Sequence, residues 1–303
     1  RLQSTLSLVY SEHGDPTRVV RLQEGELASA VAPRSVRVAW QAAPINPADI
    51  NQIEGVYPVK PPLPAVGGNE GYGIVVGVGE GVSLLRQGDH VIPTVSGLGT
   101  WRSHGDHDEA ALYPIDKRLP LEAAATIQVN PSTAYRMLKD FVDLKPGDTV
   151  VQNGATSGVG RAVMQICAIR GLKCVSVIRN RSEEALRKVK EELAGLGSTT
   201  VVTEEEMAGK MRGNVKASLA LNCVGGRSSL FLAASLAKNG VMVTYGGMSK
   251  QPLSIPTAAF IFKDIRLAGF WMSRWYQQPR NNERQSSKRA SVKRTASGRV
   301  KQP

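Results

Sequence analysis

The first 128 residues contain short stretches of apolar residues separated by glycine and proline. Residues 36–40 alternate as Val-Arg-Val-Ala-Trp, residues 73–79 are apolar and rich in glycine, and residues 89–93 form a further short stretch. Short apolar stretches with turn residues every 8 to 12 positions or so are typical of β-rich domains. We therefore expect residues 1–128 to form a small, barrel-like β domain.

From about residue 121 onward, stretches with helical spacing alternate with short apolar stretches. The helical stretches are residues 122–138, 162–168, 183–196 and 228–238, and the apolar ones are the β-branched run 149–151 and residues 174–178, 218–223, 240–245 and 265–271. Ser182 stands where a helix N-cap would, and Gly197 stands where that helix would stop. Strands that alternate with helices indicate a doubly wound parallel sheet, so we expect an α/β domain over residues 129–275.

A glycine-rich turn follows the first strand of this second domain. Residues 149–160 read Thr-Val-Val-Gln-Asn-Gly-Ala-Thr-Ser-Gly-Val-Gly and lead into an apolar helix. A dinucleotide-binding βαβ unit opens in this way, because small residues let a pyrophosphate approach the backbone at a helix N-terminus. Gly158 and Gly160 supply only part of the G-x-G-x-x-G pattern, and a ligand-free strand–helix turn can have the same residues. The order of strand, turn, helix and strand favours the nucleotide site.

The second strand of that unit ends in basic residues. Arg179, Asn180 and Arg181 stand where an acidic residue would bind the 2′-hydroxyl of the NAD ribose. An arginine there accommodates a 2′-phosphate instead. The pattern therefore predicts NADPH as the cofactor, while two ordinary surface arginines are the alternative.

The charge of the chain is concentrated at its C-terminal end. Of the net +12 carried by 303 residues, residues 280–303 contribute +7, from eight Lys and Arg against Glu283 alone. This segment has no aromatic residue and few large apolar ones, so we expect a disordered basic tail. Such a tail can bind nucleic acid through phosphates but lacks stacking residues, so we expect no sequence-specific binding. No apolar run approaches the roughly 18 residues of a membrane span.

Cysteine and histidine provide little further chemistry. The three cysteines, Cys167, Cys174 and Cys223, lie in apolar contexts and are expected to be reduced core residues. The metal-like cluster of His104, His107, Asp106, Asp108 and Glu109 is expected to be a solvated loop, so no metal site is predicted. The chain starts at Arg1 without a methionine, and residues 1–5 are compatible with the remnant of a transit peptide.

A β-rich domain followed by a nucleotide-binding domain resembles the medium-chain dehydrogenase/reductase superfamily. The agreeing motifs are residues 43–49 (Ala-Pro-Ile-Asn-Pro-Ala-Asp), 67–71 (Gly-Gly-Asn-Glu-Gly) and 144–148 (Leu-Lys-Pro-Gly-Asp). The resemblance implies a GroES-like first domain and a Rossmann second domain. Zinc alcohol dehydrogenases of the superfamily carry a histidine ligand where this chain has Asn69, so the resemblance is to its zinc-independent, quinone-reductase-like branch.

Within the superfamily, the chain is most similar to the mitochondrial trans-2-enoyl-CoA reductases, from about residue 8 to residue 275. The similar segments are residues 51–57, 97–102, 130–136, 245–248, 261–264 and 269–271. The resemblance implies NADPH-dependent reduction of enoyl-CoA or enoyl-acyl carrier protein in mitochondrial fatty acid synthesis. It also implies a homodimer formed through the Rossmann domain, a location in the mitochondrial matrix, and a first domain whose C-terminal completion is missing from this chain.

The resemblance assigns roles to individual residues. Tyr57 falls on the proton donor of the family. The residues that fall on NADPH-contacting segments are Asn130, Thr156, Ser157, Gly158, Val159, Arg179, Asn180, Arg181, Tyr245, Gly246, Gly247, Met248, Phe270, Trp271 and Met272. Trp101 is a candidate wall of the acyl or nicotinamide pocket, with core packing as the alternative. Arg102 is a candidate partner for pantetheine phosphates, with a solvated loop arginine as the alternative.

The implied chemistry is addition of a hydride to C3 of the enoyl thioester and of a proton to C2. A phenol held within hydrogen-bonding reach can donate that proton. Three other interpretations remain open. One is an NADPH quinone reductase, which shares the cofactor turn and lacks zinc. Another is a nuclear or nucleic-acid-binding adaptor that uses its tail, and the third is a non-catalytic form that dimerises with the full-length enzyme.

Overall fold

The computed structural model describes residues 4–209 and 213–278, which divide into two compact units. Among these residues, the first unit contains 4–129 and 273–278, and the second contains 130–272. The chain therefore passes from one unit to the other twice. The last helix belongs with the first unit, although the sequence pattern suggested that the second domain extends to residue 275. The expected basic tail, residues 280–303, lies outside the described residues.

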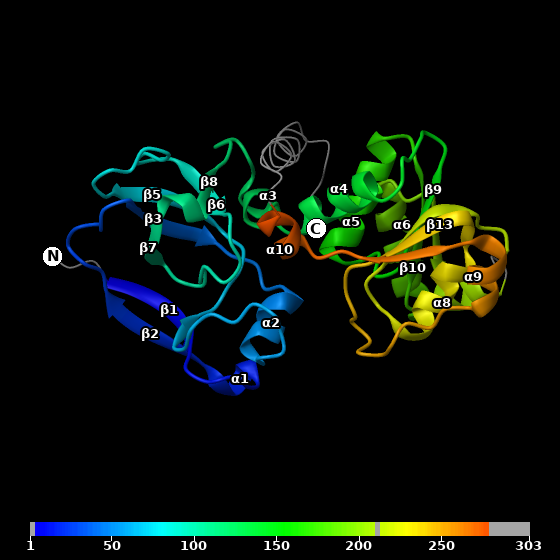
Figure 1. The fold of residues 1–303 in the computed structure, drawn as a ribbon, viewed down its shortest axis with the longest axis horizontal. Coiled ribbons are helices and arrows are strands. Elements are labelled where there is room, and N and C mark those ends of the chain that lie inside the picture. Colours follow the sequence, from blue (N-terminus) through cyan, green and yellow to red (C-terminus); the bar gives the residue numbers. More distant parts are fainter. Residues whose placement is uncertain (1–3, 210–212, 279–303) are drawn as a thin grey trace. The chain divides into compact units, whose positions relative to one another are not determined.

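The first unit contains two antiparallel sheets (Figure 1). The five-stranded sheet has the order β7 (His104–Asp108), β3 (Ser35–Ala42), β5 (Tyr72–Val78), β6 (His90–Pro93) and β8 (Leu112–Pro114). The three-stranded sheet has the order β2 (Val20–Glu26), β1 (Ser4–Tyr10) and β4 (Ala65–Val66). The strands expected at 36–40, 73–79 and 89–93 are confirmed as β3, β5 and β6.

Short helices complete the first unit. They are α1 (Pro16–Val19), α2 (Pro47–Ile53), the 3₁₀ turn η1 (Glu109–Ala111), α3 (Leu121–Thr126) and α10 (Met272–Gln277), which begins where the chain returns to this unit. Residues Val36, Val38, Val75 and Val91 form one core of the large sheet, while Ala124 of α3 packs in a second core with Tyr72 and Ile92. Alternation along the strands thus gives the sheet two buried faces.

The second unit contains a six-stranded parallel sheet (Figure 1). Its order is β11 (Thr200–Thr203), β10 (Lys173–Ile178), β9 (Thr149–Gln152), β12 (Ala217–Asn222), β13 (Leu236–Thr244) and β14 (Arg266–Gly269). Neighbouring residues of one strand face opposite sides, since Val150 and Val151 belong to different cores. The doubly wound α/β fold is therefore confirmed.

Helices cover both faces of this sheet. On one side, α4 (Asn130–Asp140), α5 (Gly158–Ile169) and α6 (Glu183–Gly195) bury Met137, Val163 and Leu193. On the other side, α7 (Glu204–Ala208), α8 (Gly226–Ala234) and α9 (Thr257–Lys263) bury Met207, Leu232 and Ala259. Within residues 4–209 and 213–278, no helix is long and apolar enough to cross a membrane.

Two local expectations were wrong, and a third was confirmed only in part. The helix expected over 122–138 is two helices, α3 and α4, because Pro131 cannot donate a backbone hydrogen bond and suits only a first helical turn. The helix expected over 228–238 ends at Ala234, because parallel pairing of Ala217 with Leu236 draws the following residues into β13. Ser182 stands at the N-cap of α6, but its side chain makes no capping hydrogen bond.

Candidate active site

The segments expected to contact NADPH follow the carboxyl ends of parallel strands. Residues 156–159 come after β9, residues 179–181 after β10, residues 245–248 after β13 and residues 270–272 after β14. All these strands run in one direction, so their carboxyl ends share one edge of the sheet. β9 lies between β10 and β12, where the strand order reverses, and ligands of open α/β sheets bind in the crevice at such a point.

The turn after β9 forms a tight entry into helix α5. Ser157 is the N-cap, and its hydroxyl accepts a hydrogen bond from the Gly160 N–H at 3.1 Å. A Cβ on Gly160 would lie 2.7 Å from the carbonyl oxygens of Gly154 and Ala155, so only glycine fits. The first N–H groups of a helix have no partner within the helix, and together with the helix dipole they attract anions. The turn is therefore a fitting cradle for a pyrophosphate.

Asn130 lies beside this turn, although it precedes Gly158 by 28 positions in the sequence, with β9 between them. A Cβ on Gly158 would lie 2.9 Å from the Asn130 amide nitrogen. Asn130 is the first residue of α4, so the amino ends of α4 and α5 meet at this point. The structure thus brings Asn130 and Gly158 together.

The basic segment after β10 is exposed. Arg179, Asn180 and Arg181 all have exposed side chains. The Asn180 amide donates to Glu205 Oε2 at 3.1 Å, and the Arg181 N–H donates to Asn180 Oδ1 at 3.1 Å. Glu205, on α7, is an acidic neighbour that the sequence reasoning missed, because its proximity depends on the pairing of β10 with β11.

A buried amide network, also missed from the sequence, joins the strand ends under the turn. Asn153 Nδ2 donates to Asn222 Oδ1 at 2.7 Å, and Asn153 Oδ1 accepts from the Cys223 N–H at 2.8 Å. Asn222 Nδ2 donates in turn to Thr244 Oγ1 at 3.2 Å. Both asparagines are at most 1 % exposed, so these hydrogen bonds fix the ends of β9, β12 and β13 relative to one another.

The two segments after β13 and β14 are held by backbone hydrogen bonds. The Tyr245 N–H donates to Asn222 O and the Met248 N–H to Cys223 O, both at 2.9 Å. Burial raises the pKa of the Tyr245 phenol, which keeps it neutral. Gly247 and Met248 are exposed, Trp271 is half-buried and Met272 is buried. The Phe270 ring meets Phe141 edge to face at 6.0 Å, which packs it against the core.

Tyr57 lies in the first unit, in the loop that follows α2. Its side chain is half-buried. The N–H groups of Val56 and Tyr57 both donate to the Asn51 carbonyl, at 2.9 and 3.1 Å. Gly55 turns the chain with φ +77°, a conformation that favours glycine, and a Cβ there would also contact His13. The end of α2 therefore sets where the Tyr57 loop begins.

Buried polar residues surround the base of this loop. Asp49 Oδ1 accepts from the backbone N–H of Asn69 at 2.9 Å and from its side-chain amide at 2.7 Å. Asn69 also contacts Gln52, and Gln52 Nε2 donates to Val59 O at 3.0 Å. Burial raises the pKa of Asp49, while its hydrogen bonds oppose that shift. The sequence reasoning noted Asn69 only as the residue at a missing zinc ligand.

Glu70 holds the segment at which the chain leaves the first unit. Its carboxylate accepts from the Val129 N–H at 2.7 Å and from Asn46 Nδ2 at 3.0 Å. The Tyr276 hydroxyl of α10 donates to the neighbouring Gln128 carbonyl at 2.8 Å. Full burial raises the pKa of Glu70 to about 8 despite these donors. Hydrogen bonds therefore hold the first unit both at residues 128 and 129, where the chain leaves it, and at α10, where the chain returns to it.

Trp101 and Arg102 have different surroundings. The Trp101 ring covers Gly67 and Gly68, where no Cβ would fit, and its Nε1–H donates to Pro44 O at 3.2 Å. Trp101 also packs beside the core of Tyr10, Ile53 and Ala65. Arg102 Nε donates to Gly99 O at 2.7 Å, and burial lowers the pKa of its guanidinium. Arg102 is therefore not the solvated loop arginine considered as an alternative.

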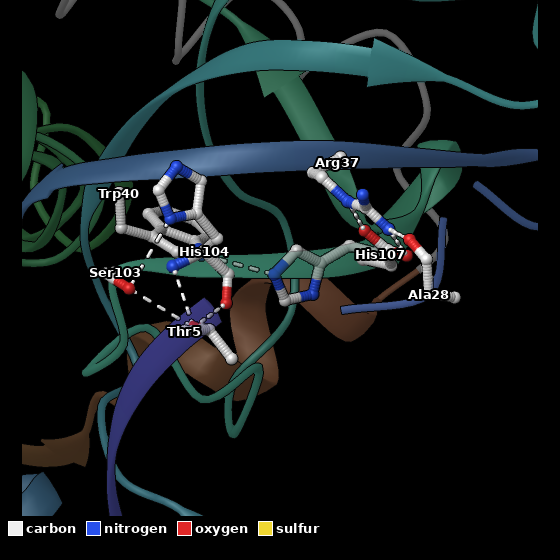
Figure 2. Close-up of polar contacts among 8 residues, drawn as sticks. Thr5, Ala28, Arg37, Trp40, Ser103, His104 and His107 are labelled. Atoms are coloured by element: carbon white, nitrogen blue, oxygen red, sulfur yellow. Dashed lines mark hydrogen bonds and ion pairs between the residues drawn. The ribbon is translucent and has the colours of Figure 1, made fainter. Parts of the chain in front are cut away.

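The histidine-rich segment forms a strand, so the expectation of a solvated loop was wrong (Figure 2). His107 is buried and accepts from Trp40 Nε1–H at 3.2 Å, while the His104 N–H donates to Thr5 Oγ1 at 3.1 Å. Asp106 pairs with Arg37 at 2.8 Å, which removes it from any shared site. Among residues 4–209 and 213–278, no group of three or more His, Cys, Asp or Glu could hold a metal ion.

Comparison with known proteins agrees with this architecture. Residues 32–117 match the alcohol dehydrogenase GroES-like domain and residues 158–288 match the zinc-binding dehydrogenase family. The mitochondrial enoyl-[acyl-carrier-protein] reductase of Caenorhabditis elegans is 57 % identical over 94 % of this chain and 82 % of its own length. The human enzyme of that name is 52 % identical over 89 % of this chain and 73 % of its own length. The chain belongs to the mitochondrial enoyl-[acyl-carrier-protein] reductase family.

Solved structures of related enzymes extend the comparison. The mitochondrial 2-enoyl thioester reductase heterodimer Etr1p/Etr2p from Candida tropicalis is 36 % identical, with a TM-score of 0.93 over 100 % of this chain and 91 % of that one. The Etr1p/NADP/crotonyl-CoA complex is 35 % identical, with a TM-score of 0.93 over 99 % and 91 % of the two chains. The quinone oxidoreductase of Escherichia coli, at 22 % identity and a TM-score of 0.83 over 98 % and 89 % of the two chains, shares the fold.

The zinc in the name of the matched dehydrogenase family does not fit the described residues of this enoyl reductase. Catalytic zinc needs about three protein ligands. Asn69 stands at one of the expected ligand positions, and its amide is fully engaged in hydrogen bonds with Asp49, Gln52 and Gly97. The residues at this position therefore do not form a catalytic zinc site.

Proposed function

We propose that this chain reduces trans-2-enoyl thioesters to saturated acyl thioesters with NADPH. The observation that carries the proposal is its membership of the enoyl-[acyl-carrier-protein] reductase family, at 57 % identity, on a fold that matches the Etr1p/NADP/crotonyl-CoA complex. The quinone reductases share the fold at only 22–24 % identity, so they do not favour the hypothesis that this chain is a quinone reductase.

NADPH fits the second unit. The turn at Ser157, Gly158 and Gly160 suits a pyrophosphate because its two glycines leave the helix N-terminus uncovered by side chains, and Asn130 adds an amide beside it. Arg179 and Arg181 are the exposed cations that would hold a 2′-phosphate, and the segments 245–248 and 270–272 would border the nicotinamide half. When bound, NADPH supplies the hydride that adds to C3 of the enoyl thioester.

Tyr57 is the residue we assign to proton transfer. Negative charge develops on the thioester oxygen as the C2–C3 double bond is reduced, and the resulting enolate needs a proton at C2. Tyr57 stands in a loop whose backbone is held at Asn51, and its half-buried phenol is a suitable acid for that carbon. The O–H bond of the phenol breaks, the C2–H bond forms, and solvent then restores the proton.

Trp101 and Arg102 remain candidates for the acyl-thioester site, but the role proposed for Arg102 changes. Trp101 is half-buried beside Ile53, whose helix leads to the Tyr57 loop, so one side of its ring can line a pocket. Arg102 is drawn inward to Gly99 O. We therefore propose that Arg102 shapes the loop of residues 97–101, and that its contact with pantetheine phosphates is secondary.

The relatives are named as mitochondrial enzymes, and we assign this chain to the mitochondrion and within it to the matrix.

We also propose a homodimer formed through the second unit. In the part of the chain that the structure describes, β14 is the last strand of the six-stranded sheet and pairs along one edge only. Ile261, Phe262 and Leu267, on α9 and β14, are 66, 76 and 39 % exposed. An apolar sheet edge of this kind is a template for pairing with a second copy.

The function is tested by following NADPH oxidation with crotonyl-CoA and, separately, with a quinone. The enoyl thioester should be consumed with NADPH in preference to NADH. Tyr57→Phe should keep NADPH binding and lower turnover by about 10²–10⁴-fold, because only the proton source is removed. Oxidation by the quinone alone would contradict the proposal, whereas full turnover of Tyr57→Phe would contradict only the role of that residue.

A further inference from the structure

We propose that Asn69 and Gln52 are positioning residues. Through a chain of hydrogen bonds they hold the Tyr57 loop, which follows α2, in the position required for proton transfer. The inference rests on the proposed function, since it concerns the residue assigned to proton transfer. It is carried by the geometry of two buried amides in the first unit.

Asn69 uses all its side-chain polar groups. Its Nδ2 donates to Asp49 Oδ1 at 2.7 Å and to Gln52 Oε1 at 3.1 Å, and its Oδ1 accepts from the Gly97 N–H at 2.6 Å. The side chain is 7 % exposed, so water does not readily replace these partners. Asn69 thereby joins helix α2 to the loop that contains Gly97.

Gln52 continues the connection to the Tyr57 loop. Its Oε1 accepts from Asn69, and its Nε2 donates to the Val59 carbonyl at 3.0 Å. Val59 is two residues beyond Tyr57, while the Val56 and Tyr57 N–H groups are held at Asn51. A Cβ on Gly97 would lie 3.1 Å from Pro61 Cγ and 3.7 Å from Val59 Cγ1, so the Gly97 loop also packs on this segment. The Tyr57 loop is therefore fixed on both sides of the phenol.

The chemistry of the amide explains why asparagine suits this position. A buried amide offers two donors and one acceptor oxygen, which is what Asp49, Gln52 and Gly97 require. A neutral imidazole offers one donor and one acceptor, so a histidine at residue 69 would leave Gln52 without its donor. Where zinc enzymes of the superfamily have a metal ligand, this chain has the centre of a hydrogen-bonded support.

The Tyr57 loop depends on such support because it buries little apolar surface. Val56 is 71 % exposed, and Pro58 and Lys60 are also exposed. Segments with few buried apolar contacts open locally at low free-energy cost. The hydrogen bond from Gln52 to Val59 is therefore a large part of what limits the positions that the phenol can take.

The test uses two substitutions of Gln52 in the full chain. Gln52→Glu keeps the size and the acceptor for Asn69 but removes the donor to Val59. Gln52→Met removes donor and acceptor without burying a charge, and serves if Gln52→Glu does not fold. Either should lower kcat with crotonyl-CoA by about 10–100-fold, because small displacements of a reacting group are costly, and should leave the KM for NADPH unchanged. Gln41→Glu is the control, since Gln41 is exposed and its side-chain amide donates to Ala39 O rather than to the Tyr57 loop.

Two further measurements separate positioning from general destabilisation. Combined with Tyr57→Phe, the Gln52 substitution should cause no additional loss of kcat, because there is no phenol left to position. Amide hydrogen exchange over residues 56–60 should accelerate in the Gln52 variants, with exchange in β3 and β5 unchanged.

Each outcome decides the question. Multiplying losses in the double variant, or unchanged exchange over residues 56–60, would overturn the inference. If exchange accelerates but Tyr57→Phe keeps full turnover, the loop support stands and the proton-donor proposal fails.

Discussion

At the scale of single residues, the proposed chemistry depends on side chains in very different settings. Arg179 and Arg181 are exposed at the end of β10, and a guanidinium is weakly hydrated compared with an ammonium and can bind a phosphate through two hydrogen bonds. Tyr57 is half-buried and its loop is tied to Gln52 and Asn51. Cofactor selectivity should therefore respond to single charges, whereas proton transfer should respond to the geometry of a whole loop.

Removal of the two arginines should change the preference for the cofactor. Arg179→Ala with Arg181→Ala should raise the KM for NADPH, since each charged hydrogen bond contributes about 1.5–3 kcal/mol, and should leave NADH nearly unaffected. Steady-state kinetics with both cofactors provides the measurement. Arg187→Ala is the matched control, because Arg187 is also exposed and pairs with Glu191 on α6. Equal losses for NADPH and NADH would contradict the assignment.

His107 should make stability depend on pH. Burial lowers the pKa of His107 to about 4, while an unfolded histidine titrates near pH 6.5. Between these values the unfolded chain binds a proton that the folded chain does not, so the contribution of His107 to stability should fall as the pH drops from about 6.5 to about 4, and should stay constant below that. The difference of about 2.5 between the folded and unfolded pKa values of His107 corresponds to at most about 3 kcal/mol of stability. Urea unfolding at pH 7.5 and 5 should show a smaller difference for His107→Gln, and an identical difference would rule out the titration of His107.

At the scale of elements, the parallel strands were predictable and the helix ends were not. Short, largely apolar stretches such as residues 218–223 are typical of strands in a sheet covered on both faces. The helix boundaries near residues 130 and 235 are decided by a proline within the first turn and by pairing with a strand elsewhere in the chain. The same dependence on contacts between distant parts of the chain limits what the sequence predicts about the site. The glycine turn and the arginines are local signals, whereas Glu205, Asn222 and Gln52 acquire their roles only through contacts between distant elements.

The helix α9 and the strand β14 offer a test of dimer formation. Phe262→Lys places a charge on the exposed apolar side of α9 and should weaken the dimer at least about tenfold without unfolding the second unit, since Phe262 is 76 % exposed. Sedimentation velocity over a range of concentrations measures the effect. Leu22→Lys, at a 66 % exposed leucine of β2 in the first unit, is the control. A dimer that weakens equally in both variants would not be formed through the second unit.

At the scale of the whole molecule, the order of the two domains could be predicted but the return of the chain could not. The change from short strands to alternating strands and helices occurs near residue 121, close to the division at residue 129. Helix α10 is only six residues long and has no periodic pattern that would assign it to either domain. Its place is set by the hydrogen bonds of Tyr276 with Gln128 and of Ser273 with Ser96, which join residues 148 and 177 positions apart.

That return has a consequence for the order in which the protein can be made. The second unit is one continuous stretch, residues 130–272, so it can fold as soon as it has left the ribosome. The first unit is interrupted, and its Gln128 carbonyl must wait for Tyr276, which is synthesised after the entire second unit. A separately expressed 130–272 fragment should therefore unfold cooperatively and bind NADPH. Residues 1–129 alone should be less stable than the same residues in the full chain. A circular permutant in which residues 273–278 precede residue 4 should allow the first unit to fold before the second unit is synthesised.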